Sequence, residues 1–559
     1  MNEKIENLLK EDRKFPPSEH LVKNANAPSS WYDEANEDRL KFWQKQALSR
    51  ISWFKEPTEI LDDSNPPFFK WFKDGELNLS YNCLDRHLES DGDRVAFYWE
   101  GEPGDTQEIT YQDLYERVCK LSNALKKLGV EKGDRVAIYL GMTPEIVVSM
   151  LACARIGAVH SVVFGGFSSE ALADRINDAK AKTVITADGA WRRGDIVPLK
   201  NNVDGSLELT EYVENVIVVK RTEQEINMTD GRDHWYHDIT DKESSDCEPE
   251  VMNSEDMLYI LYTSGTTGDP KGALLPHRTL LGHLPGVEMP HEFLSSDLSN
   301  NDCFWTPADW AWIGGLFDVL LPSLYFGIPV LSHRSSKFDP EFTFDLMEKF
   351  EVKNTFLPPT SLKMMKSFNL YKSRDKLNLR TVGSGGEALG EELLNWGKEI
   401  LNVGINEFYG QTECNLTVSN NGLIMKQKLG SIGRPVPGHK VKLMKDDGTF
   451  ISKSDDEGEI VVKSNSPSIF SGYWNNDKET QTKIIDGWLH TGDYATVDDE
   501  GYFYFKGRKD DLINRYLFAE SSINQFIEEN SFKDLNDINK EIGQTCNLNN
   551  FNSFIIIFF

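Results

Sequence analysis

Residues 262–272 read Tyr-Thr-Ser-Gly-Thr-Thr-Gly-Asp-Pro-Lys-Gly and follow an apolar run, residues 257–261, that predicts a strand. The glycines allow a tight turn that brings backbone N–H groups close to a phosphate, while hydroxyls add donors and the lysine adds positive charge. The order GxxGxxKG differs from the GxxxxGK[ST] of a Walker A loop. A plain surface turn is the alternative, but so long a run favours a phosphate loop. The residues expected to hold the phosphates are Thr263, Ser264, Gly265, Thr266, Thr267, Gly268 and Lys271.

Strands and helices are predicted to alternate through the first half of the chain. Strands are expected at residues 94–99, 134–139, 159–164 and 183–186, and helices at residues 110–128, 145–157 and 169–179. Such alternation is typical of parallel sheets flanked by helices. From about residue 435, short strands between glycine turns indicate a smaller β-rich subdomain. We therefore expect an α/β fold in which a large domain of layered parallel sheets carries a small β-rich unit.

Length, charge and cysteine usage narrow the class of protein. A chain of 559 residues is expected to form two or more compact units. The net charge of -29 argues against nucleic acid and anionic membranes as partners, because both are polyanions. The 7 cysteines are scattered without a CxxC pair, which disfavours a disulfide framework or a zinc site. Without a secretory signal or a membrane-length apolar run, the expected location is cytoplasmic.

Four further segments follow the phosphate loop. They are GSGGEAL at residues 383–389, EFYGQTE at 407–413, WLHTGD at 488–493 and GRKDD at 507–511. Taken singly, they suggest nothing more than a glycine loop, core aromatics and solvated turn residues. Taken in this order with residues 262–272, they resemble the adenylate-forming, or AMP-binding, superfamily, which includes acyl-CoA synthetases, luciferases and peptide-synthetase adenylation domains.

The resemblance implies a site for ATP and Mg²⁺. It places Tyr409 against adenine, Thr412 near the α-phosphate and Glu413 at Mg²⁺, a cation that prefers oxygen ligands. It makes Asp493 the acceptor of both ribose hydroxyls and brings Arg508 to the ribose or a phosphate. The implied nucleotide residues beyond the loop are Gly386, Glu387, Ala388, Glu407, Phe408, Tyr409, Gly410, Gln411, Thr412, Asp493 and Arg508. The implied catalytic residues are Lys271, Thr412 and Glu413, the metal-site residues are Thr263 and Glu413, and the hinge residue is Asp510.

Two other stretches resemble the acetyl- and propionyl-CoA synthetase branch of this superfamily, namely residues 71–88 and 164–176. In that branch an arginine just after the stretch matching residues 186–189 contacts the phosphates of CoA, and Arg192 takes this place. Asp195 stands where the branch has a second basic residue, so the CoA contact is expected to be weaker or differently built.

The expected acyl pocket departs from that branch. Acetyl-CoA synthetases carry two tryptophans before Gln-Thr-Glu, whereas this chain has Tyr409 and Gly410. Replacing tryptophan by glycine is expected to open space for an acid longer or bulkier than acetate, because packed interiors favour a ligand that fills a void. The alternative is that Trp310 or Trp312 fills the gap. The expected pocket residues are Trp312, Ile313, Gly314, Gly385 and Gly410.

The chain is expected to divide into six parts. They are a polar segment at residues 1–30, an N-terminal extension at 31–90, the AMP-binding α/β core at 91–434, the β-rich subdomain at 435–508, a hinge at 509–514 and a divergent, disordered tail at 515–559. Residues 31–60 read as amphipathic helix anchored by Trp31, Trp43, Trp53 and Phe54. The family's C-terminal lid domain, with its near-terminal lysine, is expected to be absent, since the tail holds only Lys533 and Lys540.

The resemblance implies an AMP-forming acyl-CoA ligase for a short- to medium-chain acid. It would convert ATP, a carboxylate and CoA into acyl-CoA, AMP and pyrophosphate through an acyl-adenylate. Without the lid domain the activity is expected to be impaired, and the alternative is a catalytically silent module that binds a nucleotide or acyl-adenylate. A carrier-protein-dependent adenylation enzyme is disfavoured by the segment at residues 71–88. The sequence indicates no particular oligomeric state.

Overall fold

The structure is a computed structural model, and it describes the following residues. They are 14–15, 29–264, 270–294, 301–335, 337–368, 377–386, 389–451 and 456–509. The expected hinge residue Asp510 and the tail at 515–559 lie outside them. Within these ranges, no helix has both the length and the apolar character needed to cross a membrane. The six cysteines that the structure describes are all buried free thiols.

The first large sheet has seven strands, in the order β13-β12-β9-β7-β8-β15-β16. Its strands are β7 (Arg135–Tyr139), β8 (Val159–Val162), β9 (Thr183–Ala187), β12 (Asn215–Val219), β13 (Asp233–Trp235), β15 (Met257–Ser264) and β16 (Pro270–Pro276). Every neighbouring pair is parallel except β15 and β16. The parallel layer predicted from alternating elements is therefore confirmed, and the expected phosphate loop joins its one antiparallel pair.

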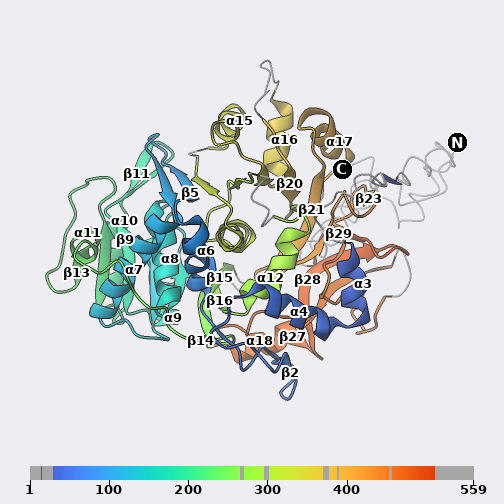
Figure 1. The fold of residues 1–559 in the computed structure, drawn as a ribbon, viewed down its shortest axis with the longest axis horizontal. Helices are drawn as coiled ribbons and strands as arrows, with labels where there is room; N and C mark the ends of the chain where they lie inside the picture. Colours follow the sequence, from blue (N-terminus) through green and yellow to red (C-terminus); the bar gives the residue numbers. More distant parts are fainter. Residues whose placement is uncertain are drawn as a thin grey trace, which may run out of the picture.

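Helices flank this sheet, at the left of Figure 1. They are α7 (Tyr111–Lys127), α8 (Pro144–Arg155), α9 (Ser169–Ala179), α10 (Leu199–Leu207) and α11 (Tyr236–Thr240). Helix α7 begins with a capping box between Thr110 and Asp113, and it buries an apolar stripe spaced by three and four residues. Ser168 caps α9 by accepting from the N–H of Ala171. The predicted helices agree with these bounds to within two residues.

The second sheet has nine strands, in the order β24-β22-β21-β20-β19-β17-β18-β5-β6. Its strands are β5 (Val95–Glu100), β6 (Thr106–Thr110), β17 (Phe304–Trp305), β18 (Val330–His333), β19 (Asn354–Phe356), β20 (Thr381–Ser384), β21 (Ile405–Gln411), β22 (Asn415–Ser419) and β24 (Arg434–Pro435). Strands β19, β20 and β21 are parallel, so their carboxyl ends meet at one edge. Ligands of open α/β sheets bind at such edges.

Helices and one π-helical turn accompany the second sheet. They are α12 (Thr279–Glu288), α13 (Ile313–Gly315), the π-helical turn η2 (Leu316–Leu320), α14 (Leu321–Phe326), α15 (Pro340–Lys349), α16 (Pro359–Ser367) and α17 (Glu391–Ile400). The turn η2 lies between α13 and α14 without a break. Single π-helical turns inside helices are frequent at functional sites.

The third sheet confirms the β-rich subdomain of the expected fold. It is built from β25 (Val441–Met444), β26 (Glu457–Lys463), β27 (Ile484–Ile485), β28 (Trp488–Val497) and β29 (Phe503–Arg508), with helix α18 (Asp477–Lys483) beside it. Its strands pair antiparallel. Strands β28 and β29 place Asp493 directly opposite Arg508. Two residues expected at the ribose therefore lie on adjacent strands.

The N-terminal extension folds differently from the sequence expectation. Helices α3 (Ser30–Glu37) and α4 (Arg39–Arg50) form, but the predicted helix over residues 51–60 is wrong, because the backbone N–H groups of Phe54 and Lys55 bond to the carbonyl of Glu76 instead. Phe54 is largely exposed rather than an anchor. Trp43 is fully buried, and its Nε1 donates to the carbonyl of Gly438 at 3.1 Å. Helix α4 therefore packs beside the five-stranded sheet (Figure 1).

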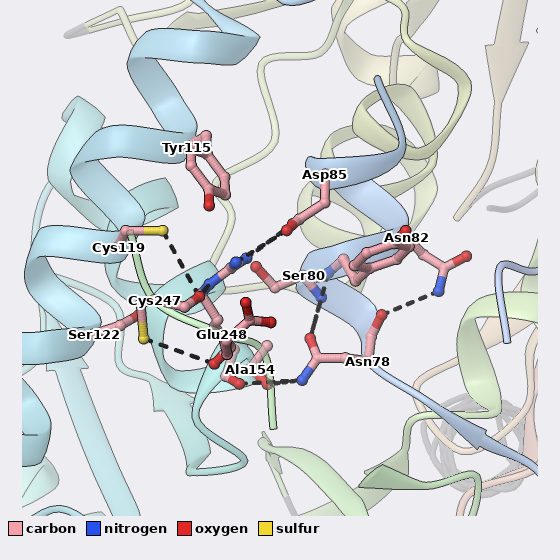
Figure 2. Close-up of polar contacts among 12 residues, drawn as sticks. Asn78, Ser80, Asn82, Asp85, Tyr115, Cys119, Ser122, Ala154, Cys247 and Glu248 are labelled. Carbon is pink, nitrogen blue, oxygen red and sulfur yellow. Dashed lines mark hydrogen bonds and ion pairs between the residues drawn. The ribbon is translucent and has the colours of Figure 1, made fainter. Parts of the chain in front are cut away.

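A buried ion pair joins the extension to the core. Helix α6 (Asp85–Asp91), which follows α5 (Leu79–Cys83), carries Asp85, and its carboxylate accepts two bonds from the guanidinium of Arg155 at 2.8 and 2.9 Å. Asn78, ahead of α5, donates to the carbonyl of Ala154 at 2.9 Å. Figure 2 shows Asp85 and Asn78 on one side of this junction and Cys119 on the other. The contacts fix the extension against the end of α8.

Candidate active site

A cavity of about 340 Å³ lies where the second sheet meets the five-stranded sheet. The residues that line it are Ile313, Gly314, Asp318, Phe356, Gly385, Gly386, Phe408, Tyr409, Gly410, Gln411, Asn415, Leu416, Ile432, Asp493, Phe505 and Arg508. They include the carboxyl end of β21, one residue of β28 and two residues of β29. One cavity therefore brings together residues expected at adenine, at the ribose and at the acyl group.

Asp493 is the polar centre of the end of this cavity at which the nucleotide is expected. Its Oδ2 accepts from the Tyr409 hydroxyl at 2.7 Å and from Gln411 Nε2 at 2.5 Å, and Arg508 lies 4.0 Å from Oδ1. Burial raises the pKa of Asp493, while the hydrogen bond from Tyr409 and the charge of Arg508 oppose that rise. Tyr409 and Gln411 therefore hold Oδ2 of Asp493 by hydrogen bonds, whereas Oδ1 has only the more distant guanidinium of Arg508 beside it.

The glycines of the cavity differ in the space beside them. Gly386 has a φ of +98°, and a Cβ there would meet nothing within 4 Å. A Cβ at Gly385 would come within 2.8 Å of the Phe408 ring, and one at Gly410 would overlap the backbone of Asn415. Both glycines line the cavity, but the Phe408 ring and the backbone of β22 occupy the space beside them, so the expected widening of the acyl pocket at Gly385 and Gly410 stays a prediction.

Glu407 holds the backbone at Leu389. It is buried and does not line the cavity, and its Oε1 accepts from the N–H of Leu389 at 2.8 Å. Burial raises its pKa to about 8, opposed by that hydrogen bond. Phe408 does line the cavity, and its ring packs 5.0 Å from Phe356. Glu387 and Ala388 lie outside the described residues.

The described ends of the phosphate loop connect to the expected metal residue. Thr263 pairs across the hairpin with Lys271, whereas Gly265, Thr266, Thr267 and Gly268 and the side chain of Ser264 lie outside the described part of the structure. Lys271 forms an ion pair with Glu479 of α18, and its Nζ lies 5.9 Å from the centre of the Tyr473 ring. The Tyr473 hydroxyl donates to Glu413 Oε1 at 2.5 Å.

Thr412 and Glu413 form the turn between β21 and β22, directly after Gln411. Thr412 is half-buried and Glu413 is buried. The chain of contacts from Lys271 through Tyr473 to this turn continues through Gln411 to Asp493. The loop ends and the ribose carboxylate therefore border the same region of the molecule.

Comparison with known families bears on this arrangement. Residues 84–474 match the model of the AMP-binding enzyme family, and residues 29–83 match the acetyl-coenzyme A synthetase N-terminus. The chain belongs to the AMP-binding enzyme family. It falls in the acetyl-CoA synthetase-like branch, whose members are AMP-forming acid–thiol ligases.

Relatives and a solved structure support this assignment. An acetyl-coenzyme A synthetase of Streptomyces avermitilis is 42% identical over 530 residues, which cover 92% of this chain and 80% of that protein. One from Streptomyces coelicolor is 41% identical over 526 residues, with the same coverage. A crystal structure of a Brucella canis acyl-CoA synthetase superposes with a TM-score of 0.67 at 28% identity, covering 78% of this chain and 75% of that one.

The residue expected at CoA lies in a second pocket of this AMP-binding enzyme. A cavity of about 60 Å³ is lined by Arg192, Arg221, Arg334 and Phe164, and its lining also includes the acidic residues Glu100, Glu102 and Asp309. The guanidinium groups of Arg192 and Arg334 lie 5.0 and 4.7 Å from the centre of the Phe164 ring. Arg221 and Arg334 come from other parts of the chain, and each is paired with a carboxylate, Arg221 with Asp105 and Arg334 with Asp309.

Trp312 does not line the larger cavity and lies instead beside Phe164, a residue of the second pocket. Its side chain is 45% exposed, and its ring centre lies 6.2 Å from that of Phe164 and 6.4 Å from that of Phe167. Trp310 is buried and also does not line the larger cavity. Neither tryptophan fills the acyl end, so the alternative considered from the sequence is not what the structure shows.

Several residues of the site gave no sequence signal. Tyr473 and Glu479 lie beyond the expected motifs, in a stretch that reads as an ordinary turn and helix start. Asp318 and Asn415 sit among apolar residues, where a lone polar side chain is usually a satisfied core residue. Local patterns could not predict that Ala273 of β16 pairs with Tyr473. They also could not predict that α13 continues directly into η2.

Proposed function

We propose that this chain binds ATP and a short- to medium-chain carboxylic acid in the 340 Å³ cavity, forms the acyl-adenylate, and transfers the acyl group to CoA. The observation that carries the proposal is the bonding of Tyr409 and Gln411 to Asp493 inside a cavity that also contains Ile313 and Gly314. A nucleoside held at Asp493 would have its phosphates within reach of the acyl end.

In the first step a carboxylate oxygen attacks the α-phosphorus of ATP, and the bond to the β-phosphate oxygen breaks to release pyrophosphate. Two anions must approach each other, so positive charge and hydrogen-bond donors at the phosphates lower the barrier. Lys271 supplies positive charge and Thr412 a hydroxyl, while Asp493 fixes the ribose. In the second step the CoA thiol attacks the acyl carbon, gives up its proton, and AMP leaves.

The residues at Glu413 fit a magnesium ion. Glu413 is a buried carboxylate beside the loop ends, and only its Oε1 is engaged by Tyr473. Mg²⁺ is usually held by one or two carboxylates together with substrate phosphates and water. When bound beside Glu413, the ion would neutralise charge on the phosphates. Thr263 lies on strand β15, opposite Lys271 of β16. Tyr473 orients the Glu413 carboxylate.

CoA is proposed to bind beside Arg192. The three arginines around the smaller pocket offer charge for phosphate groups, and arginine suits phosphate because its planar fork donates in pairs. Arg334 is already paired with Asp309, and Arg221 with Asp105 at 2.9 Å, which leaves Arg192 as the member of the three without a described carboxylate partner. Arg192→Ala is accordingly expected to raise the KM for CoA more than that for ATP.

The acid is proposed to be larger than acetate. The support is the side of the cavity formed by Ile313, Gly314 and Leu416, where the lining contains no tryptophan among the residues that the structure describes. A series of acids from acetate to octanoate tests this proposal. Hexanoate is expected to bind more tightly than acetate, because each buried methylene contributes about 0.8 kcal/mol. Acetate binding as tightly as butyrate and hexanoate would refute it.

Carboxylate-dependent exchange of labelled pyrophosphate into ATP tests the proposed reaction. Exchange that requires both the acid and Mg²⁺ is the expected result, and the variant Lys271→Ala should lose most of it. Binding of ATP without any exchange would instead identify a module that holds the nucleotide silently. Absence of ATP binding would refute the assignment of the cavity.

A further inference from the structure

A buried carboxyl group lies in the acyl end of the larger cavity. Asp318, on the π-helical turn η2, lines the cavity and is only 5% exposed. Its Oδ1 lies 2.8 Å from Nε2 of His283 on α12, and His283 is itself buried. Within the described part of the chain, His283 is the one hydrogen-bond partner of the Asp318 side chain. The second carboxyl oxygen, Oδ2, remains available.

Gly314 leaves this oxygen uncovered. A methyl group at Gly314 would stand 3.7 Å from Oδ2 of Asp318 and 3.0 Å from the Phe356 ring. A side chain at this position would therefore be in van der Waals contact with the Asp318 carboxyl group. Gly314, which was expected to make room for a larger acyl chain, therefore also leaves the carboxyl oxygen of Asp318 accessible from the cavity.

A second polar side chain borders the same cavity without a partner. Asn415 is 1% exposed and lines the cavity, and neither its Oδ1 nor its Nδ2 has a hydrogen-bond partner among the described residues. Buried polar groups are normally hydrogen-bonded, and each exception calls for an explanation. The neighbouring wall is formed by Ile313, Phe356 and Leu416, which offer no polar side-chain atoms.

These groups form an acceptor and a donor in an otherwise apolar wall. A buried carboxyl oxygen or amide without a partner destabilises the protein by about 1–3 kcal/mol, and a ligand group that bonds to it recovers this free energy. A purely hydrocarbon acyl chain cannot form such a hydrogen bond and therefore recovers none of this free energy. A hydroxyl can either donate to Asp318 or accept from the Asn415 amide, whereas an ammonium group can only donate.

We propose that the acid recognised by this chain carries a hydroxyl group along its chain, and that Asp318, held by His283, accepts the hydrogen bond of that hydroxyl. This rests on the proposed function, because it assumes that the acyl group enters beside Gly314. Sites built around a hydroxyl discriminate strongly against analogues that lack it, since the polar groups are then left unpaired. Asp318 is thus assigned as the specificity-determining residue.

Equilibrium binding tests this without requiring turnover. The probes are N-acylsulfamoyl-adenosines that carry a hexanoyl group or its 3-, 4-, 5- or 6-hydroxy or 6-amino derivative. Sulfamoyl-adenosine alone is the reference. In the full chain at least one hydroxy isomer is expected to bind roughly tenfold or more tightly than the hexanoyl probe. In Asp318→Leu, which keeps the branching of the side chain but has no acceptor, this advantage should vanish while sulfamoyl-adenosine binds as before.

The outcomes separate this inference from the proposed function. Failure of every probe, including sulfamoyl-adenosine, would overturn the nucleotide site and with it the proposed function. Tightest binding of the unsubstituted hexanoyl probe would overturn the hydroxyl assignment alone, as would tightest binding of a 6-amino probe. The comparison among probes is made in the unaltered chain, so it remains valid even if Asp318→Leu fails to fold. In that case Asp318→Asn, which keeps one acceptor oxygen, should show a preference for the hydroxy probe that is smaller than in the unaltered chain.

Discussion

Lys271 of strand β16 is held by an ion pair with Glu479 of helix α18. The lysine is largely buried and Glu479 is half-buried, so solvent screens this pair only in part. The same lysine is the charged residue of the proposed phosphate loop. A triphosphate must therefore compete with Glu479 for it, and α18 becomes a determinant of nucleotide affinity.

Glu479→Gln is expected to tighten ATP binding several-fold. The change removes the competing negative charge near Lys271 and leaves the helix cap of α18 intact, because that cap uses the backbone N–H of residue 479. Isothermal titration with ATP would measure the effect. Asp477→Asn, which removes an exposed charge from the same helix, is the matched control and should change the affinity little. Equal effects of the two substitutions would show that only the overall charge matters.

The variants Lys271→Ala and Asp493→Ala should affect different parts of the nucleotide. Lys271 is proposed to contact the phosphates, so its loss should weaken ATP binding roughly tenfold and leave adenosine binding unchanged. Asp493 is placed for the ribose, so its loss should weaken ATP, AMP and adenosine by a similar factor of about ten or more. Titrations of both variants with the three ligands give the comparison. An unchanged ATP affinity in both would contradict the site.

Asp85→Asn is expected to destabilise the fold by about 3–5 kcal/mol, because it leaves the guanidinium of Arg155 buried without its carboxylate. Arg155 is 1% exposed, so water cannot replace the lost partner. Urea unfolding would measure the change in free energy. Glu89→Gln, on the exposed side of the same helix, should have an effect within about 0.5 kcal/mol. A small effect at Asp85 would mean that the N-terminal extension contributes little to the core.

Glu407 predicts a pH dependence of stability. Its folded-state pKa of about 8 lies above its ordinary 4.5, so the folded protein binds the extra proton between these values. Its contribution is complete below about pH 4.5, declines as the pH rises and levels off above about 8. Glu407→Gln should remove this decline, gaining on the order of 4 kcal/mol relative to the unaltered chain by pH 8.

Unfolding free energies between pH 5 and 9 would measure that difference. Glu399→Gln, at an exposed position of α17, serves as the control and should follow the unaltered chain at every pH. A Glu407→Gln curve parallel to that of the unaltered chain would show that Glu407 is ionised in the folded protein.

Local patterns predicted the fold well where periodicity was strong. The stripe of Leu114, Val118, Leu121 and Leu125 marked α7, and all four side chains are buried. The same reasoning failed over residues 51–60. The apolar spacing was present there, but the backbone forms hydrogen bonds to the distant Glu76 instead of a helix. Backbone pairing across distant segments leaves no local trace, so sequence periodicity could not predict it.

The sequence by itself determined the family, the alternating architecture and the order of the motifs, because backbone turns at glycines and apolar periodicity are local properties of the chain. Only the tertiary structure decided what fills the space beside Gly410, where Trp312 lies, which carboxylate holds Lys271 and that Asp318 borders the acyl end. Those outcomes depend on packing between segments far apart in the chain, and packing in a dense interior is settled by all neighbours together.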